Sequence, residues 1–191
     1  MASVLIPLAQ GCEELEAVTI IDLLRRAGIT VTTASLDPDK LVVASRGTKL
    51  VADKTLADIG DQLFDMLVLP GGLPGSDYLR DDPKVQACIK AHFKAKRYVA
   101  AICAAPRALA AAGVLDGCNA TSYPGTLDKM TNVPGMRYVE QDVVIDGTII
   151  TSRGPGTAMD FALTLIEVLD SKIKRLAVEG PLLRPKKETP Q

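Results

Sequence analysis

The sequence contains the stretch RYVAAICAAPRALAAA, residues 97–112, in which an apolar run changes into a helical pattern at a cysteine. The run from Arg97 to Ile102 is short, apolar and partly β-branched, which is typical of a buried strand. The residues from Ala104 onward favour a helix, and Pro106 lies near its first turn, where the missing N–H costs no hydrogen bond. The stretch therefore predicts a strand and a helix joined by a tight turn at Cys103.

Apolar runs of strand length alternate with helical patterns along most of the chain. Such alternation predicts an α/β fold with a doubly wound, mostly parallel sheet and helices on both faces. Residues 1–183 are expected to form one domain, followed by a polar, loose tail over 184–191. The expected strands cover residues 4–9, 29–35, 66–69, 98–102, 143–145 and 148–151, with helices over 13–27, 83–96, 104–112 and 157–169 and a small hairpin over 41–44 and 49–52.

The composition excludes several classes of function. The chain has 191 residues, of which 47% are hydrophobic, and a formal net charge of −1, so specific nucleic-acid binding is not expected. No apolar run is long enough to cross a membrane, and the first strand leads into Glu13 and Glu14 without the basic segment of a signal peptide. The four cysteines are too scattered for a disulfide framework or a metal site, so we expect a cytoplasmic location and no metal or other cofactor.

Unusual residues follow four of the expected strands. They are Gln10–Glu16, Pro70–Gly75, Cys103 and Ser152–Thr157. Because ligands of open α/β sheets bind beyond the carboxyl ends of the strands, we expect these segments to surround one crevice.

Cys103 is the candidate nucleophile. A cysteine in an apolar segment is more often a buried structural residue, but a strand-to-helix turn places the thiol beside unpaired N–H groups and a helix dipole, which favour the thiolate. We therefore expect its pKa to lie well below the ~8.5 of a free thiol. Cys12, Cys88 and Cys118 lack such surroundings and are interpreted as packing or loop residues.

Glu16 is the second candidate. Helical spacing places it beside Ile20 and Leu23, at the edge of the apolar stripe of its helix. A desolvated carboxyl there would favour its neutral form, and could donate a hydrogen bond to a thiolate or move a proton on a substrate. The alternative is a solvated first-turn glutamate that complements the helix dipole.

Backbone groups and arginines supply further candidates. Alone, the Gly71-Gly72 pair predicts a tight turn, but beside a nucleophile its N–H groups can stabilise an oxyanion. Arg46, in a hairpin turn, either reaches an anionic ligand or a partner subunit or is simply solvated. Arg153 precedes the last helix and is interpreted as structural. His92, the single histidine, lies in a polar helical pattern and is expected at the surface, which disfavours a Cys–His hydrolase.

Four motifs occur in order along the chain: Gly11–Glu16, Leu69–Gly72, Ala101–Pro106 and Thr151–Thr157. Together they resemble the DJ-1/ThiJ branch of the DJ-1/PfpI superfamily, and the resemblance extends from Val4 to about Leu169.

The resemblance implies a flavodoxin-like homodimer in which Cys103 is a reactive thiol and Glu16 is its protonated partner. It also implies an anion pocket formed by the backbone of Gly72 and Ala104, with Arg46 near the subunit boundary. Tyr123 stands where some relatives carry a histidine, so an acid–base role of that histidine does not apply to this chain. The candidate substrate- or anion-binding residues are Gly71, Gly72, Ala104, Arg46, Tyr123 and Arg153.

The expected function is a cofactor-independent glyoxalase or deglycase that acts on methylglyoxal-type 2-oxoaldehydes, free or as early adducts on proteins or nucleotides. In this hypothesis Cys103 adds to the aldehyde and Glu16 moves a proton. An oxidative-stress sensor or chaperone that uses oxidation of Cys103 is the alternative, and a cysteine peptidase is a weaker one. No membrane partner is expected.

Overall fold

Strands and helices alternate along the chain as the apolar runs predicted. The computed structural model describes residues 1–185, so residues 186–191 of the expected tail lie outside the described part. The strands are β1 (Ser3–Leu8), β2 (Thr30–Ser35), β3 (Leu41–Val43), β4 (Lys49–Val51), β5 (Lys54–Thr55), β6 (Met66–Leu69), β7 (Tyr98–Ile102), β8 (Asn119–Ala120), β9 (Arg137–Tyr138), β10 (Val143–Asp146) and β11 (Ile149–Ser152). The helices are α1 (Glu14–Arg26), α2 (Leu56–Ile59), α3 (Gly75–Asp81), α4 (Pro83–Lys94), α5 (Pro106–Ala111), α6 (Ala158–Leu169) and α7 (Lys172–Glu179), with short 3-10 turns at Leu127–Lys129, Pro155–Thr157 and Gly180–Leu182.

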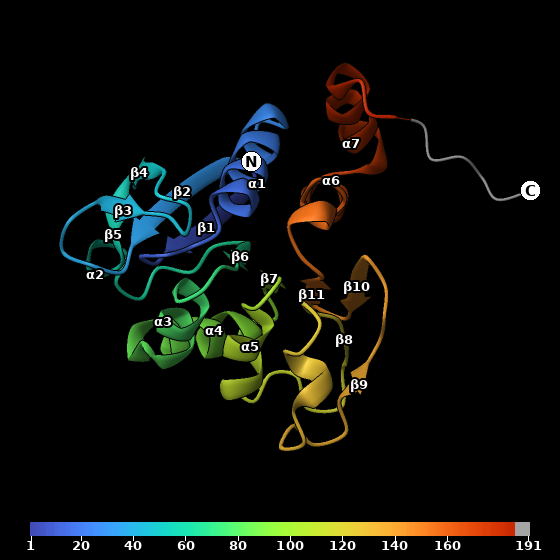
Figure 1. The fold of residues 1–191 in the computed structure, drawn as a ribbon. Coiled ribbons are helices and arrows are strands. Elements are labelled where there is room, and N and C mark those ends of the chain that lie inside the picture. Colours follow the sequence, from blue (N-terminus) through green and yellow to red (C-terminus); the bar gives the residue numbers. More distant parts are fainter. Residues whose placement is uncertain (186–191) are drawn as a thin grey trace, which may run out of the picture.

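A seven-stranded sheet with the order β10-β11-β7-β6-β1-β2-β5 forms the centre of the molecule (Figure 1). All neighbours in it pair in parallel except β10 and β11, which form an antiparallel hairpin. The expected hairpin is present as β3 and β4, which pair outside this sheet. The doubly wound, mostly parallel α/β fold is thereby confirmed.

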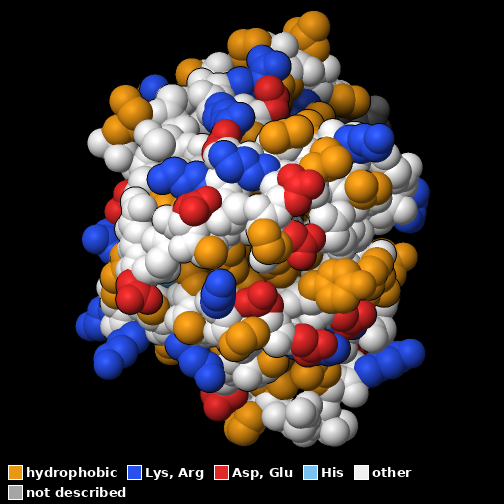
Figure 2. All heavy atoms as spheres, turned by 90° about the vertical axis from the view of Figure 1, so that its left-hand side faces the viewer, with side chains coloured by type: hydrophobic (Ala, Val, Ile, Leu, Met, Phe, Trp, Pro, Cys, Tyr) orange, Lys and Arg blue, Asp and Glu red, His pale blue; other side chains and the backbone are white. Residues whose placement is uncertain are grey.

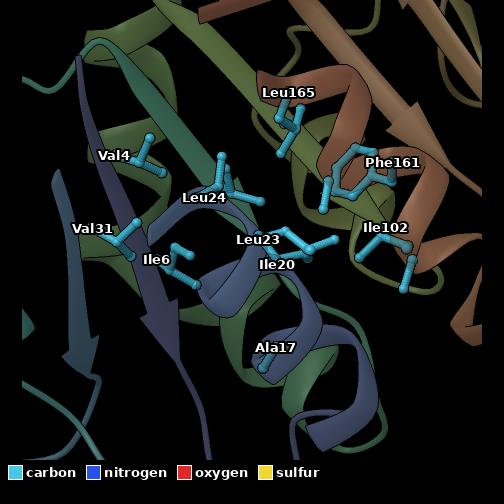
Figure 3. Packing of buried hydrophobic residues seen from close by; sticks show 14 of the residues in the cluster. Val4, Ile6, Ala17, Ile20, Leu23, Leu24, Val31, Ile102, Phe161 and Leu165 are labelled. Carbon is cyan, nitrogen blue, oxygen red and sulfur yellow. The ribbon is translucent and has the colours of Figure 1, made fainter. Parts of the chain in front are cut away.

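Helices cover both faces of the sheet. On one face α1 packs against α6 over the sheet, and α7 packs against α6, whereas α3, α4 and α5 lie on the other face (Figure 1). Buried apolar side chains of α1 meet those of α6 and of the strands beneath them, with Ile20 and Leu24 near Phe161 and Leu165 (Figure 3). This packing matters for function because it sets the position of α1, which carries Glu16.

Four helix assignments differ from the sequence prediction, and one of them is the short α2, which was not expected. The α3 helix was not expected, because glycines and prolines around it are typical of a loop. The polar α7 was also not expected, and it buries only Val178. The helix after Cys103 starts at Pro106 instead of Ala104, because Cys103 itself has a left-handed backbone conformation.

The last described residues contact the helices before them. Arg184, which the sequence assigns to the tail, forms ion pairs with Asp160 at 2.8 Å and with Glu179 at 3.0 Å. Among residues 1–185, no helix has both the length and the apolar character needed to cross a membrane.

Candidate active site

The four unusual segments meet at the carboxyl ends of neighbouring strands, as expected. The chain leaves β1 toward β2 on one side and returns as β6 on the other, so the loops after β1 and β6 lie side by side at the carboxyl ends of adjacent strands. The Glu13 N–H donates to the Gly71 carbonyl at 2.9 Å, which joins these two loops. The Cys103 N–H donates to the Ser152 carbonyl at 3.0 Å, which joins the loops after β7 and β11.

Cys103 lies at a sharp backbone turn directly after β7. Its φ of +63° is in the left-handed region, which non-glycine residues adopt rarely and at a cost of about 1–3 kcal/mol. Its carbonyl accepts a hydrogen bond from the Tyr123 N–H at 2.8 Å, so both backbone groups of the turn are held by other loops. The turn keeps Cys103 at the carboxyl end of β7, where the chain changes direction toward α5.

Glu16 is fully buried in the first turn of α1, which contradicts the alternative of a solvated residue. Its Oε2 accepts a hydrogen bond from the Gly71 N–H at 2.8 Å. Its Oε1 is buried without a nitrogen or oxygen partner among residues 1–185, and its carboxyl group interacts with the Cys103 thiol. A carboxyl group with one buried oxygen left without a nitrogen or oxygen partner is better suited to carry a proton than a negative charge.

Gly71 lies between the side chains of Cys103 and Glu16 and packs closely against both. A Cβ atom at this position would lie 2.5 Å from the Cys103 Cβ and 2.6 Å from Glu16 Oε2. Only glycine therefore permits this approach of the two side chains. Its N–H is bound to Glu16, so the expected role of this N–H in holding an oxyanion is not what the structure shows.

The acid–base properties of the two side chains depend on each other. Burial, together with the negative charge of Glu13, raises the pKa of Glu16 to about 7. Burial, then the charge and the hydrogen bond of an ionised Glu16, raise the pKa of Cys103 to about 12. Our expectation of a low pKa for Cys103 is thus wrong for the state with an ionised Glu16, because burial and a neighbouring anion outweigh the backbone N–H groups.

Two negative charges are disfavoured at this distance, so the Cys103–Glu16 pair retains one proton around neutral pH. A thiolate forms only when that proton resides on Glu16. Two N–H groups, from Gly72 and Ala104, interact with the sulfur and lower the pKa of Cys103. The α5 dipole adds little, because this helix has only six residues and Ala105 lies between it and Ala104.

Tyr123 and Arg153 lie in loops that contact the Cys103 turn. The Tyr123 side chain is about half exposed, and its ring lies against Gly154. The Arg153 guanidinium forms an ion pair with Glu140 at 3.1 Å, so its charge is compensated within the chain.

Arg46 is exposed on the β3–β4 turn. Its backbone N–H donates to Glu14 at 2.9 Å and its guanidinium donates to the Ser45 carbonyl at 3.4 Å. The Ser45 hydroxyl donates to both Glu13 and Glu14 at 3.0 Å, so this turn is fixed to the start of α1. In the described residues, no hydrogen bond or ion pair joins Arg46 to Cys103 or Glu16.

His92 is fully buried, so the expected surface position is wrong. Its Nδ1 donates to the Cys88 carbonyl at 2.8 Å, its Nε2 accepts from the Phe64 N–H at 3.1 Å, and its ring stacks on that of Phe64. Both ring nitrogens are engaged away from Cys103, so His92 is not a base for this thiol. Its polar sequence neighbours face solvent, and this hid its burial from sequence reasoning.

Some contributors were missed from the sequence. Ser152 fixes the Cys103 turn through its carbonyl, and Ser45 fixes the turn that carries Arg46. Leu73 follows Gly72 and is 56% exposed beside the sulfur-binding N–H. Backbone carbonyls leave no signal in sequence, whereas a leucine in a Gly/Pro-rich loop after a strand was a signal that could have been used.

Comparison with known proteins identifies relatives of this chain. The family model described as "DJ-1/PfpI family" matches residues 2–168. Protein DJ-1 homolog B of Arabidopsis thaliana is 47% identical over 95% of this chain, which spans only 42% of that protein's length. Parkinson disease protein 7 homolog of Danio rerio is 42% identical, with 94% of this chain and 95% of the relative covered. Glutathione-independent glyoxalase DJR-1.2 of Caenorhabditis elegans is 35% identical, with 95% of each covered.

Solved structures agree with the fold. Oxidized Toxoplasma gondii DJ-1 superposes with a TM-score of 0.92 and 38% identity, covering 97% of this chain and 100% of that one. Drosophila melanogaster DJ-1beta superposes with a TM-score of 0.91 and 41% identity, covering 97% and 99%. With the family match over nearly the whole described fold, these relatives show that this chain belongs to the DJ-1/PfpI family.

Proposed function

We propose that this chain is a cofactor-independent glyoxalase that converts 2-oxoaldehydes such as methylglyoxal, free or as early adducts, into 2-hydroxy acids. The observation that carries the proposal is the buried contact of Cys103 and Glu16 across Gly71. A nucleophile and a proton carrier that share one proton suit a reaction in which a proton moves between adjacent carbons. The name of the Caenorhabditis elegans relative supports the same activity.

The first step forms a bond between sulfur and the aldehyde carbon. The Cys103 thiolate attacks this carbon, and the electron pair of the C=O bond moves to its oxygen, which takes the proton of Glu16. The product is a hemithioacetal, and Glu16 is now a carboxylate. The N–H groups of Gly72 and Ala104 stabilise negative charge at the sulfur before attack and at the oxygen during it.

The second step is an isomerisation, after which hydrolysis releases the product. Glu16 removes the hydrogen of the former aldehyde carbon as a proton and returns a proton to the neighbouring carbon, while the hydroxyl proton moves to the neighbouring oxygen. The first carbon is oxidised and the second is reduced, so no external oxidant is needed. Water then attacks the resulting thioester and the C–S bond breaks. One proton of the water returns to the Glu16 carboxylate, the 2-hydroxy acid leaves, and Cys103 is a thiolate again.

Turnover of methylglyoxal by the purified chain, followed as 2-hydroxy acid formation, tests this proposal. The Cys103→Ser variant should have no measurable turnover and an unchanged fold, because the two side chains are nearly isosteric. A matched Cys118→Ser variant alters a half-buried thiol outside the site and should retain activity. Absence of turnover in the unmodified protein, or full activity of Cys103→Ser, would contradict the proposal.

A redox sensor is the second candidate function, and the oxidized state named for the Toxoplasma gondii structure favours it. Here the thiolate reacts with two molecules of hydrogen peroxide to give a sulfinate and two molecules of water. A protonated Glu16 would hold the sulfinate by a hydrogen bond. Mass spectrometry after peroxide treatment detects oxidation of Cys103 to the sulfinate, and the turnover assay detects the glyoxalase. Oxidation without turnover would indicate the sensor. The peptidase hypothesis loses support, because both nitrogens of His92 are engaged elsewhere.

We further propose that the chain forms a homodimer through the face that carries α1, β3 and β4. Large apolar side chains are exposed there, and Val18 of α1 and Val51 of β4 line the same hollow of about 290 Å³. Figure 2 shows hydrophobic side chains between charged ones on the side of the molecule that carries β3 and β4. Exposed apolar patches of this kind favour association. Light scattering of the protein and of a Val51→Asp variant tests the dimer.

A further inference from the structure

The left-handed turn at Cys103 is held by two neighbouring loops through its backbone. The Cys103 N–H donates to the Ser152 carbonyl, and the Cys103 carbonyl accepts the Tyr123 N–H. A non-glycine residue keeps a positive φ only where its surroundings impose this conformation. The groups that fix Ser152 and the loop of Tyr123 therefore also fix the thiol.

The Thr151 side chain fixes the loop that carries Tyr123. Its hydroxyl oxygen accepts the Thr121 N–H at 2.9 Å, between residues 30 positions apart in the sequence. Thr151 and Thr121 are both fully buried, so this N–H would lose a hydrogen bond at considerable cost if the loop moved. Because Tyr123 lies two residues after Thr121, the bond also sets where the Tyr123 N–H meets the Cys103 carbonyl.

The Ser152 side chain fixes the second loop. It points to the opposite face of β11 from Thr151, since successive residues of a strand alternate in direction. Its hydroxyl donates to the Asp142 carbonyl at 2.7 Å and lies 2.7 Å from the Thr157 hydroxyl, which in turn accepts the Gly154 N–H at 3.1 Å. These contacts close the loop after β11 on itself and fix the Ser152 carbonyl at the end of the strand.

Thr157 also connects this loop to the helices that position Glu16. It is the residue directly before α6, and α6 packs against α1, which carries Glu16. The contact between the Ser152 and Thr157 hydroxyls thus joins the residue that binds the Cys103 N–H to the helix that supports the acid. A change in this contact would alter the approach of the thiol to Glu16.

We propose that the hydroxyl groups of Thr151, Ser152 and Thr157 are positioning groups that hold the Cys103 thiol against Glu16. They act through the backbone of the Cys103 turn and through α6, and take no part in bond making. Their effect on turnover rests on the proposed glyoxalase function, whereas their effect on the thiol does not.

Loss of one of these hydroxyls should change the titration of the thiol. A relaxed turn moves the Cys103 sulfur away from the N–H groups of Gly72 and Ala104 and from the proton of Glu16, all of which favour the thiolate. Burial then remains and disfavours the thiolate. The pH midpoint of Cys103 alkylation should therefore rise.

The test compares Thr151→Val and Thr157→Val, which remove a hydroxyl at nearly constant volume, with Thr151→Ser and Thr157→Ser, which keep it. In both valine variants the alkylation midpoint should rise by at least about half a pH unit. For methylglyoxal, kcat should fall at least about tenfold with KM changed less than about threefold, because a misplaced pair slows the reaction more than it weakens binding. Both serine variants should keep the midpoint and most of kcat.

Thr164→Val is the matched control. Thr164 lies in α6, and its hydroxyl donates to the Asp160 carbonyl at 2.7 Å within the helix, away from the Cys103 turn. This variant should keep both the midpoint and kcat of the unmodified protein. Circular dichroism checks that each variant is folded, and Ser152→Ala, a smaller change, replaces a valine variant that does not fold.

Three results would overturn the positioning role. They are an unchanged alkylation midpoint in the folded valine variants, an equal change in the serine variants, and an equal change in Thr164→Val. If the unmodified protein does not turn over methylglyoxal, the glyoxalase function is overturned instead, and the alkylation midpoints still decide whether the hydroxyls position the thiol.

Discussion

The amide nitrogen of Gly71 lies 2.8 Å from Oε2 of Glu16, although the two residues are 55 positions apart in the sequence. This hydrogen bond connects the loop after β6 to the first turn of α1. It fixes one carboxyl oxygen, while the other, Oε1, is buried without a nitrogen or oxygen partner among the described residues, and the carboxyl group interacts with the Cys103 thiol. The orientation of the acid that acts with the thiol is thus set by a glycine amide.

Replacement of Gly71 by alanine should damage the site. The added methyl group would meet both Cys103 and Glu16, so turnover of methylglyoxal should fall by about a hundredfold through misplacement of the pair. The free energy of unfolding should fall by about 1–3 kcal/mol, which is typical of overpacking. Gly180→Ala is the matched control, because a Cβ there meets nothing within 4 Å. Equal activity of the two variants would show that the close approach is unimportant.

Alkylation of Cys103 should depend on pH through its partner. The pair loses its first proton around pH 7, since the pKa of Glu16 is raised to about 7, and retains the second far above that. After the first proton is lost, the remaining proton is shared between Cys103 and Glu16, and a thiolate exists whenever it resides on Glu16. The alkylation rate should therefore rise with a midpoint near pH 7 and then level off. Rates measured from pH 5 to 10 by peptide mass spectrometry, which separates Cys103 from the other thiols, provide the check.

In Glu16→Gln this midpoint should move upward, because burial still raises the pKa of the thiol while the acid proton is absent. A midpoint near the ordinary ~8.5 in both proteins would show that the two groups are not coupled.

Turnover should respond to Glu16→Gln more strongly than alkylation does. An amide can donate a hydrogen bond to sulfur but cannot take up and return a proton. We expect methylglyoxal turnover to fall at least about a hundredfold, the size typical of a lost proton carrier. Near-normal turnover would contradict the mechanism, even though the family membership would stand. Glu14→Gln, in the same helical turn but half-buried and bound to the β3–β4 turn instead of Gly71, controls for the loss of a charge near the site.

Replacement of His92 by alanine should reduce stability and leave catalysis intact. The change leaves the Phe64 N–H and the Cys88 carbonyl without their partner inside the protein, which costs about 1–3 kcal/mol of unfolding free energy. Urea unfolding measures this loss, and turnover at 25 °C should stay within about twofold, because a catalytic base contributes roughly a hundredfold or more. The exposed Lys94→Ala on the same helix should change stability little. A hundredfold loss of turnover in a folded His92→Ala would revive the Cys–His hydrolase hypothesis.

Acidification should destabilise the protein through the same histidine. Burial, aided by the charge of Arg97, lowers the pKa of His92 below its ordinary 6.5. Below pH 6.5 the unfolded chain therefore binds a proton that the folded chain does not, so the contribution of His92 to stability is complete above 6.5 and declines as the pH falls. The free energy of unfolding should therefore decrease through this group as the pH falls from about 7.5 to about 5.5.

Glu16 acts in the opposite direction in this pH range, because its pKa in the folded state is raised from 4.5 to about 7. The loss in His92→Gln must therefore be subtracted from that in the unmodified protein, which leaves the contribution of His92 alone. A difference of zero would mean that His92 titrates normally.

Local sequence was sufficient to predict the strand–Cys103–helix unit, the doubly wound sheet and the position of Glu16 on the apolar stripe of α1. Hydrophobic periodicity reports which face of an element is buried, and strand ends report where loops meet. Four motifs in order were enough to indicate the family, which the comparisons then showed.

Tertiary structure alone decided the burial of His92, the ion pair of Arg153 with Glu140 and the state of the Cys103 thiol. Each depends on groups supplied by distant parts of the chain. A pKa and a buried hydrogen bond are set by the surrounding dielectric and by partner atoms, and neither is encoded in the spacing of residues along one element. For Cys103, local sequence pointed to the N–H groups that favour the thiolate, whereas folding added the burial and the carboxylate that oppose it.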